Sequence, residues 1–155
     1  MPTNSSTDFD STANASSTAP EDIPRAWWFA EAKEDYSRFS LLEETVVYMR
    51  KVLEEQGPFD GVWGFSQGAA MAAMLASLVE RPSLHPVFAA PGKDWPPPPF
   101  KFAIIGSGFL PMDPRCAPWF SPKVETPSLH ILGRADTIVG EGEWKLDLVS
   151  YWDRS

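Results

Sequence analysis

A serine lies between two glycines in the run Gly64-Phe65-Ser66-Gln67-Gly68. This pattern is typical of a nucleophile elbow, in which a serine on a tight strand-to-helix turn has a strained backbone. The residues two before and two after it must lack bulk so that strand and helix approach closely, and Gly64 and Gly68 meet that need. We therefore predict that Ser66 is a nucleophile and that the Gln67 backbone N–H stabilises an oxyanion.

The spacing alone is a weak signal, because a G-x-S-x-G match arises by chance and an ordinary glycine-rich turn would also show it. The flanking residues supply the missing context. Val62-Trp63 before the serine is typical of a strand, and the alanine-rich segment 69–78 after it is typical of a helix. This context favours the elbow over the ordinary turn.

Composition narrows the classes of function. The chain has 155 residues, enough for one domain but short for a parallel α/β sheet covered on both faces. Its formal charge is −8, from 13 basic and 21 acidic residues, and no Lys/Arg cluster occurs. Nucleic acid and anionic membrane surfaces are therefore not expected as partners.

The cysteine and histidine content argues against a disulfide framework and against a zinc site. There is one cysteine, Cys116, which we interpret as a packed thiol, and there are two histidines. We predict no metal and no cofactor. No signal-peptide pattern and no run of eighteen apolar residues occurs, so we expect neither secretion nor membrane spanning, and a cytoplasmic or nuclear location.

The chain divides into a tail and a domain. Residues 1–24 are dominated by small polar residues, which predicts a disordered tail, and residues 25–155 form the predicted domain. The domain opens with the aromatic run Trp27-Trp28-Phe29. These side chains either enter the core first or line a substrate mouth, and the core interpretation is the better supported.

Two helices are predicted beside the elbow. Ser40 and Glu43 match a capping box, apolar residues follow at helical spacing, and Gly57-Pro58 ends that helix. The segment 69–79 is apolar on almost every side, which predicts a helix buried between a sheet and other elements. The proline-rich segment 83–99 is predicted to be a rigid connection.

Segment 101–106 is a continuous apolar run of the kind found in parallel strands buried on both sides, and 128–132, stopped by Gly133, is predicted to be a further strand, so the predicted class is α/β. Segment 110–122 is predicted to be loop and 141–152 a last helix. Asp136 follows the strand 128–132, at the sheet edge where open α/β sheets bind ligands. It is the candidate orienting acid, and a loop aspartate in an Asp-Thr turn is an equally good interpretation.

Several segments occur in the order seen in one known family. They are Arg25-Ala26-Trp27-Trp28-Phe29, 57–61 leading into 64–69, Ser107-Gly108-Phe109, and 126–133 followed by Asp136. Together they resemble the serine hydrolase family labelled FSH, a branch of the α/β-hydrolase fold. The resemblance runs from about Arg25 to about Val139.

The resemblance implies esterase or acyl-thioesterase chemistry on a small-molecule or carrier-bound acyl substrate, in some relatives within secondary metabolism. It implies that Ser66 is the nucleophile, that Gln67 supplies one oxyanion N–H and that Asp136 orients the base. These roles follow the logic of a triad, in which a histidine takes the serine proton and a carboxylate holds that histidine.

The family order is serine, aspartate, histidine, yet none of residues 137–155 is a histidine. His85 and His130 precede the acid, and we interpret both as structural. The family's first strand and its His-Gly loop also have no counterpart here, so we expect a partial α/β-hydrolase fold. The elbow strand should then have an unpaired edge and an uncovered apolar face.

Two functions therefore stay open. The chain is either a serine hydrolase, with little activity in this form, or a non-catalytic scaffold or interaction remnant of one. The uncovered face predicts poor solubility or self-association, although the oligomeric state itself is not set by the sequence.

Overall fold

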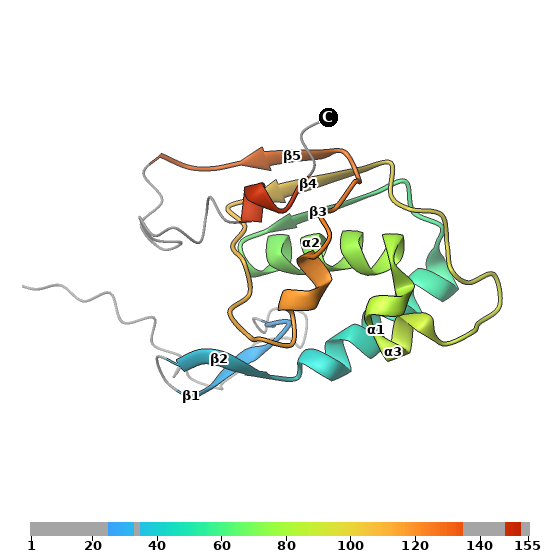
Figure 1. Ribbon diagram of the computed structural model, residues 1–155, viewed down its shortest axis with the longest axis horizontal. Coiled ribbons are helices and arrows are strands. Elements are labelled where there is room, and N and C mark those ends of the chain that lie inside the picture. The colour runs from blue at the N-terminus through green and yellow to red at the C-terminus, as the bar shows by residue number, and fades with distance from the viewer. Residues whose placement is uncertain (1–24, 33–34, 135–147, 153–155) are drawn as a thin grey trace, which may run out of the picture.

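The computed structural model describes residues 25–32, 35–134 and 148–152 (Figure 1). The predicted tail 1–24, Asp136 and most of the predicted last helix lie outside these residues. The strands and helices, with η for 3₁₀ helices, are β1 (Phe29–Ala32), β2 (Asp35–Ser40), α1 (Leu42–Gln56), β3 (Gly61–Phe65), α2 (Gln67–Glu80), η2 (Pro82–Leu84), α3 (Pro86–Ala89), β4 (Phe102–Gly106), η3 (Ala117–Phe120) and β5 (Ser128–Ile131).

Strands β3, β4 and β5 form a parallel sheet in that order. Helix α2 packs against β3 and β4. Figure 1 shows α2 between this sheet and a second layer made of the β1–β2 hairpin and α1. The predicted α/β class with a parallel sheet is therefore confirmed, and α2 is buried along most of its length as its all-round apolar sequence predicted.

The two faces of the sheet differ in their cover. Ala103 and Ile105 of β4 are fully buried on the face that α2 contacts. On the other face large apolar side chains are exposed, namely Trp63 (69%), Phe65 (65%), Phe102 (45%), Leu129 (57%) and Ile131 (52%). The continuous apolar run 101–106, which suggested a strand buried on both sides, therefore belongs to a strand with one open face, as the expected lack of cover implied.

The predicted capping box is wrong. Helix α1 begins after Leu41, which has φ 62° and makes no side-chain cap. Ser40 instead ends β2, and its hydroxyl donates to the Phe29 carbonyl across the hairpin at 3.4 Å. Glu43 turns away from the helix end toward His85 and Arg115. The β1–β2 hairpin was not predicted from the sequence. It places the Ser40 hydroxyl against the Phe29 carbonyl instead of against the amides of α1.

The opening aromatics and the proline-rich connection are only partly as predicted. Trp28 is buried and stacks on Phe39 with ring centroids 5.4 Å apart, whereas Phe29 is exposed. The segment 83–99 contains η2 and α3, and the loop 110–122 contains η3. Trp95 anchors the connection, because its indole N–H donates to the Phe88 carbonyl at 2.7 Å.

Candidate active site

Ser66 lies at the junction of β3 and α2 with φ 53° and ψ −120°. A residue with a side chain is strained there, and such strain persists only where surrounding contacts enforce it. The Ser66 N–H donates to the Gly106 carbonyl of β4 at 2.8 Å, and the Ser66 carbonyl accepts from Ala69 N–H at 2.9 Å. The serine is thus fixed to the sheet on one side and to the first turn of α2 on the other.

The two glycines of the motif have unequal surroundings. A Cβ on Gly64 would overlap the Gly68 carbonyl and lie 2.6 Å from the Ala69 nitrogen, so the backbone of α2 crosses β3 directly over Gly64. A Cβ on Gly68 would meet only the Trp27 indole nitrogen, at 3.7 Å, which is an ordinary contact. The close approach of strand and helix therefore depends on Gly64.

Gln67 is the first residue of α2, so its backbone N–H has no acceptor within the helix. The N-terminus of a helix also carries partial positive charge. An oxyanion formed at Ser66 would find both features beside it. The Gln67 side chain points elsewhere, because its amide hydrogen bonds to the backbone of Trp27 and Trp28.

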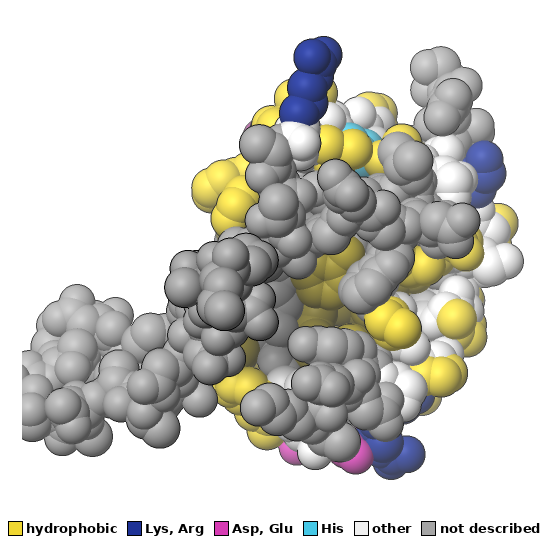
Figure 2. All heavy atoms as spheres, turned by 90° about the vertical axis from the view of Figure 1, so that its left-hand side faces the viewer, with side chains coloured by type: hydrophobic (Ala, Val, Ile, Leu, Met, Phe, Trp, Pro, Cys, Tyr) yellow, Lys and Arg dark blue, Asp and Glu magenta, His cyan; other side chains and the backbone are white. Residues whose placement is uncertain are grey.

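The carboxyl ends of β3, β4 and β5 meet at the end of the molecule that Figure 2 shows. Hydrophobic side chains are visible on this face among the described residues. Since Ser66 directly follows β3, the turn lies at this end, where parallel sheets bind ligands.

The sequence was compared with known proteins. Residues 1–154 match the family described as serine hydrolase (FSH1). The chain belongs to this family. The esterase OVCA2 of Mus musculus is 36% identical over 134 residues, which cover 81% of this chain and 53% of that protein.

Two Schizosaccharomyces pombe proteins are also similar to this FSH1-family chain. An uncharacterized hydrolase is 36% identical over 136 residues, covering 84% of the chain and 29% of that protein. A protein named dihydrofolate reductase is 37% identical over 116 residues, covering 72% of the chain and 23% of that protein. The chain therefore spans about half the length of the mouse esterase and less than a third of either of these two proteins.

A serine nucleophile needs a base within hydrogen-bond reach, and both histidines of the chain are engaged with other residues. His85 is 6% exposed, pairs with Glu43 at 3.1 Å and accepts from Val87 N–H. His130 lies 3.1 Å from the Ser128 hydroxyl, and burial lowers the pKa of its ring. Neither hydrogen bonds to Ser66, so the interpretation of both as structural histidines agrees with their contacts.

Asp136 lies outside the described residues, which end on this side at Arg134, two residues before it. Its role as orienting acid stays a prediction. Cys116 is fully buried, and burial raises the pKa of its thiol to about 12. It therefore carries almost no thiolate at neutral pH, as expected of a packed cysteine.

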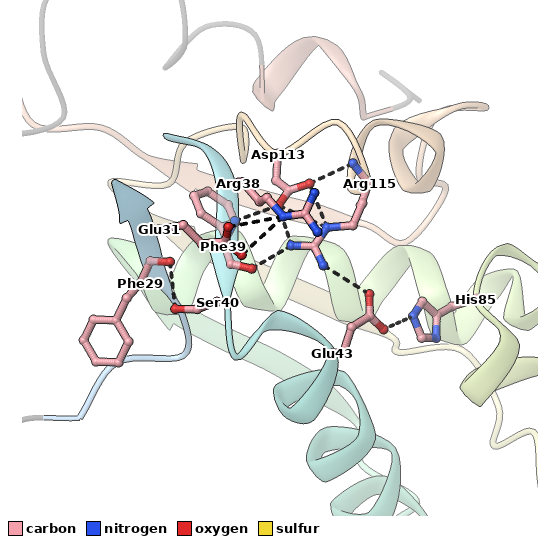
Figure 3. Close-up of polar contacts among 9 residues, drawn as sticks. All are labelled: Phe29, Glu31, Arg38, Phe39, Ser40, Glu43, His85, Asp113 and Arg115. Atoms are coloured by element: carbon pink, nitrogen blue, oxygen red, sulfur yellow. Dashed lines mark hydrogen bonds and ion pairs between the residues drawn. The ribbon is translucent and has the colours of Figure 1, made fainter. Parts of the chain in front are cut away.

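A polar cluster joins the hairpin, α1 and the loop before η3 (Figure 3). The Asp113 carboxylate, 2% exposed, accepts from Phe39 N–H at 2.8 Å and from Arg115 at 2.6 Å. Arg115 also donates to the Phe39 carbonyl and pairs with Glu43, which in turn pairs with His85. No local sequence pattern indicates this cluster, because Phe39 and Asp113 lie 74 positions apart in the chain.

Electrostatics identify this cluster as structural. Burial acts to raise the pKa of Asp113, but the hydrogen bonds and charge of Arg115, with Phe39 N–H, outweigh it and lower that pKa to about 2. A shallow cleft of about 410 Å³ lies beside the cluster and is lined by Glu43, His85, Arg115 and mainly apolar side chains. Each of these three polar side chains already has a partner within the protein.

Among the described residues, no helix is both long enough and apolar enough to cross a membrane.

Proposed function

We propose that this chain carries the nucleophile of a serine hydrolase that cleaves carboxylic esters or acyl thioesters, with Ser66 attacking the acyl carbon. The observation that carries the proposal is the strained conformation of Ser66, φ 53° and ψ −120°, at a strand-to-helix junction. A nucleophilic serine at the carboxyl end of a parallel sheet accounts for this strain.

The Gln67 backbone N–H is proposed to stabilise the tetrahedral oxyanion, as the first free amide of α2. Asp136 is proposed to orient the base that takes the Ser66 proton. A serine hydroxyl is a weak nucleophile unless a base lies within about 3 Å of it. Because His85 and His130 are bound elsewhere, the 155-residue chain is expected to react slowly.

The substrate is proposed to be an apolar acyl group on a small alcohol, a thiol or a carrier. The hydrophobic side chains at the carboxyl end of the sheet, among them Phe65 directly before Ser66, favour such a group over a charged one (Figure 2). The esterase name of the OVCA2 relatives supports the ester class.

The test is covalent labelling of Ser66 by a fluorophosphonate, followed by peptide mass spectrometry. Ser107 offers a matched control, since it also has a positive φ (47°) and follows the neighbouring strand β4. We expect an adduct on Ser66 in the wild type and in Ser107→Ala, and none in Ser66→Ala. Added imidazole should accelerate labelling of the wild type only through Ser66, because it substitutes for the missing base.

A folded wild-type chain without a Ser66 adduct, even in imidazole, would overturn the proposal. It would favour the second candidate, a non-catalytic scaffold, which the engagement of both described histidines already supports. Hydrolysis of p-nitrophenyl butyrate by the same variants gives the turnover number of each for an ester substrate.

A further inference from the structure

The Gln67 side chain forms a clamp on a segment 40 residues upstream. Its Oε1 accepts from the Trp27 N–H at 2.8 Å, and its Nε2 donates to the Trp28 carbonyl at 2.9 Å. Both ends of the amide are therefore used on the backbone of one dipeptide, and both bonds are partly buried. A buried polar group without a partner costs about 1 to 3 kcal/mol of stability. The Trp27 N–H, the Trp28 carbonyl and the Gln67 amide therefore depend on one another for their hydrogen bonds.

Two further contacts hold the same dipeptide. The Thr45 hydroxyl of α1 donates to the Trp27 carbonyl. The Trp28 ring is buried against Phe39. Gln67 therefore binds the Trp27 N–H and Thr45 binds the Trp27 carbonyl, so both polar groups of this backbone unit are held.

The Trp27 indole lies beside the nucleophile turn. Its ring nitrogen would be 3.7 Å from a Cβ on Gly68, two residues after Ser66. The ring is only half-buried, so it packs partly on the core and presents the remainder outward. An apolar ring fixed at this place can contact the acyl group of an ester bound at Ser66.

We propose that Gln67 is a positioning residue whose side chain clamps Trp27 in place as the wall that sets which acyl groups fit beside Ser66. This inference rests on the proposed function, because the wall matters only if Ser66 reacts. It assigns the Gln67 side chain a task separate from its backbone N–H. Every substitution at Gln67 other than proline keeps that N–H, so the two tasks can be separated by mutation.

The first experiment measures the clamp without any reaction. Gln67→Met preserves side-chain length and removes both hydrogen bonds. We expect amide hydrogen exchange of Trp27 to become about fivefold faster in Gln67→Met, since one lost hydrogen bond is worth about 1 kcal/mol. Thr45→Val is the matched control: it removes the third bond to the dipeptide and leaves the Trp27 N–H bonded to Gln67.

The second experiment measures the wall by the labelling rates of fluorophosphonates with a short and a long alkyl chain. Trp27→Ala removes the indole that limits the space beside Ser66, and Gln67→Met releases it. Both variants should therefore raise the ratio of long-chain to short-chain labelling by about fivefold. Phe29→Ala is the control, because Phe29 lies two residues on and is 54% exposed. Its ratio should not change.

Each result has one meaning. Unchanged Trp27 exchange in a folded Gln67→Met variant would reject the clamp, and faster exchange with an unchanged ratio would reject the wall. If the wild type gives no Ser66 adduct, the proposed function fails and the wall fails with it, while the exchange result still decides the clamp. Should Gln67→Met not fold, Gln67→Leu, which also removes both hydrogen bonds, takes its place, and its ratio must then rise.

Discussion

At the Ser66 turn a serine is held in a strained conformation by backbone hydrogen bonds, whereas at the Asp113 cluster a buried carboxylate is held by side-chain charge. The turn borders the open face of the sheet, because Phe65, directly before the serine, is 65% exposed. The cluster lies between α1, the hairpin and the loop before η3, and its charges pair with one another. The region with more ionisable groups is thus the one whose charged groups are already paired within the protein.

The difference separates a cluster that stabilises the fold from a position that is a candidate for reaction. A fully paired cluster stabilises the fold, because each of its charges already has a partner. A strained serine with a free helix amide beside it has its hydrogen-bonding capacity left for a ligand. The following predictions test this contrast from the stronger effect to the weaker.

The largest effect is expected at Gly64. In Gly64→Ala the new methyl group would overlap the backbone of Gly68, and neither β3 nor α2 can move without breaking the turn. We expect the loss of more than about 4 kcal/mol of unfolding free energy, which most domains of this size cannot tolerate. Urea titration followed by circular dichroism measures it. A variant that unfolds within 1 kcal/mol of the wild type would show that the turn is less tightly packed than described.

The second effect is the acid dependence of the cluster. Because the pKa of Asp113 is lowered in the folded protein, its ionised form stabilises the fold above the unfolded pKa of 3.8, and this contribution is lost as the pH falls from about 4 to about 2. It amounts to about 2 kcal/mol. Asp113→Asn should lower the urea midpoint at pH 6 and show a smaller further loss in acid than the wild type.

The same variant tests the contrast with the turn. Its labelling rate at Ser66, measured below the unfolding temperature, should equal that of the wild type, since Asp113 contacts neither Ser66 nor Gln67. A large drop in labelling of folded Asp113→Asn would show that the cluster takes part in the chemistry after all.

Sequence reasoning located the turn because its signal is local. A glycine two residues before a serine, a strand-like pair and an alanine-rich helix all lie within 62–79, and the conformation of Ser66 agrees with them. The strand-like runs further along the chain likewise predicted β4 and β5. The cluster was not found, because Asp113 binds Phe39 across 74 positions and no local pattern records such a contact.

The capping box and the β1–β2 hairpin also differ from the prediction, each for its own reason. Ser40 and Glu43 have the spacing of a capping box, but the hairpin offers Ser40 the Phe29 carbonyl, and Glu43 finds His85 and Arg115. Tertiary partners thus outweighed a local preference worth about 1 kcal/mol. The β1–β2 hairpin itself was not predicted, because β2 has the polar sequence Asp35-Tyr36-Ser37-Arg38-Phe39-Ser40, without regular alternation.

The third prediction concerns the open face of the sheet. The exposed apolar side chains of β3, β4 and β5 leave on the order of 600 Å² uncovered, at the upper end of what a monomer presents. We expect the 155-residue chain to self-associate through this face. Trp63→Thr should shift the association midpoint by about tenfold in analytical ultracentrifugation. Tyr48→Thr, an exposed aromatic on α1, is the control and should leave it unchanged.

The smallest effect is expected at Gly68, the second glycine of the motif. In Gly68→Ala the methyl group meets only the Trp27 indole nitrogen at an ordinary contact distance, and position 68 has no positive φ that would exclude a side chain. Alanine restricts the unfolded chain and suits a helix better than glycine, so the variant should be neutral or more stable by up to about 1 kcal/mol. Thermal melting measured beside Gly64→Ala decides the matter. A loss above 1 kcal/mol at Gly68 would mean that Trp27 is pressed onto the turn more tightly than the 3.7 Å spacing implies, and that both glycines are needed for close packing. A neutral result would show that the close packing of the turn depends on Gly64. It would also show that Gly68, two residues after Ser66, leaves room for a methyl group beside the Trp27 indole.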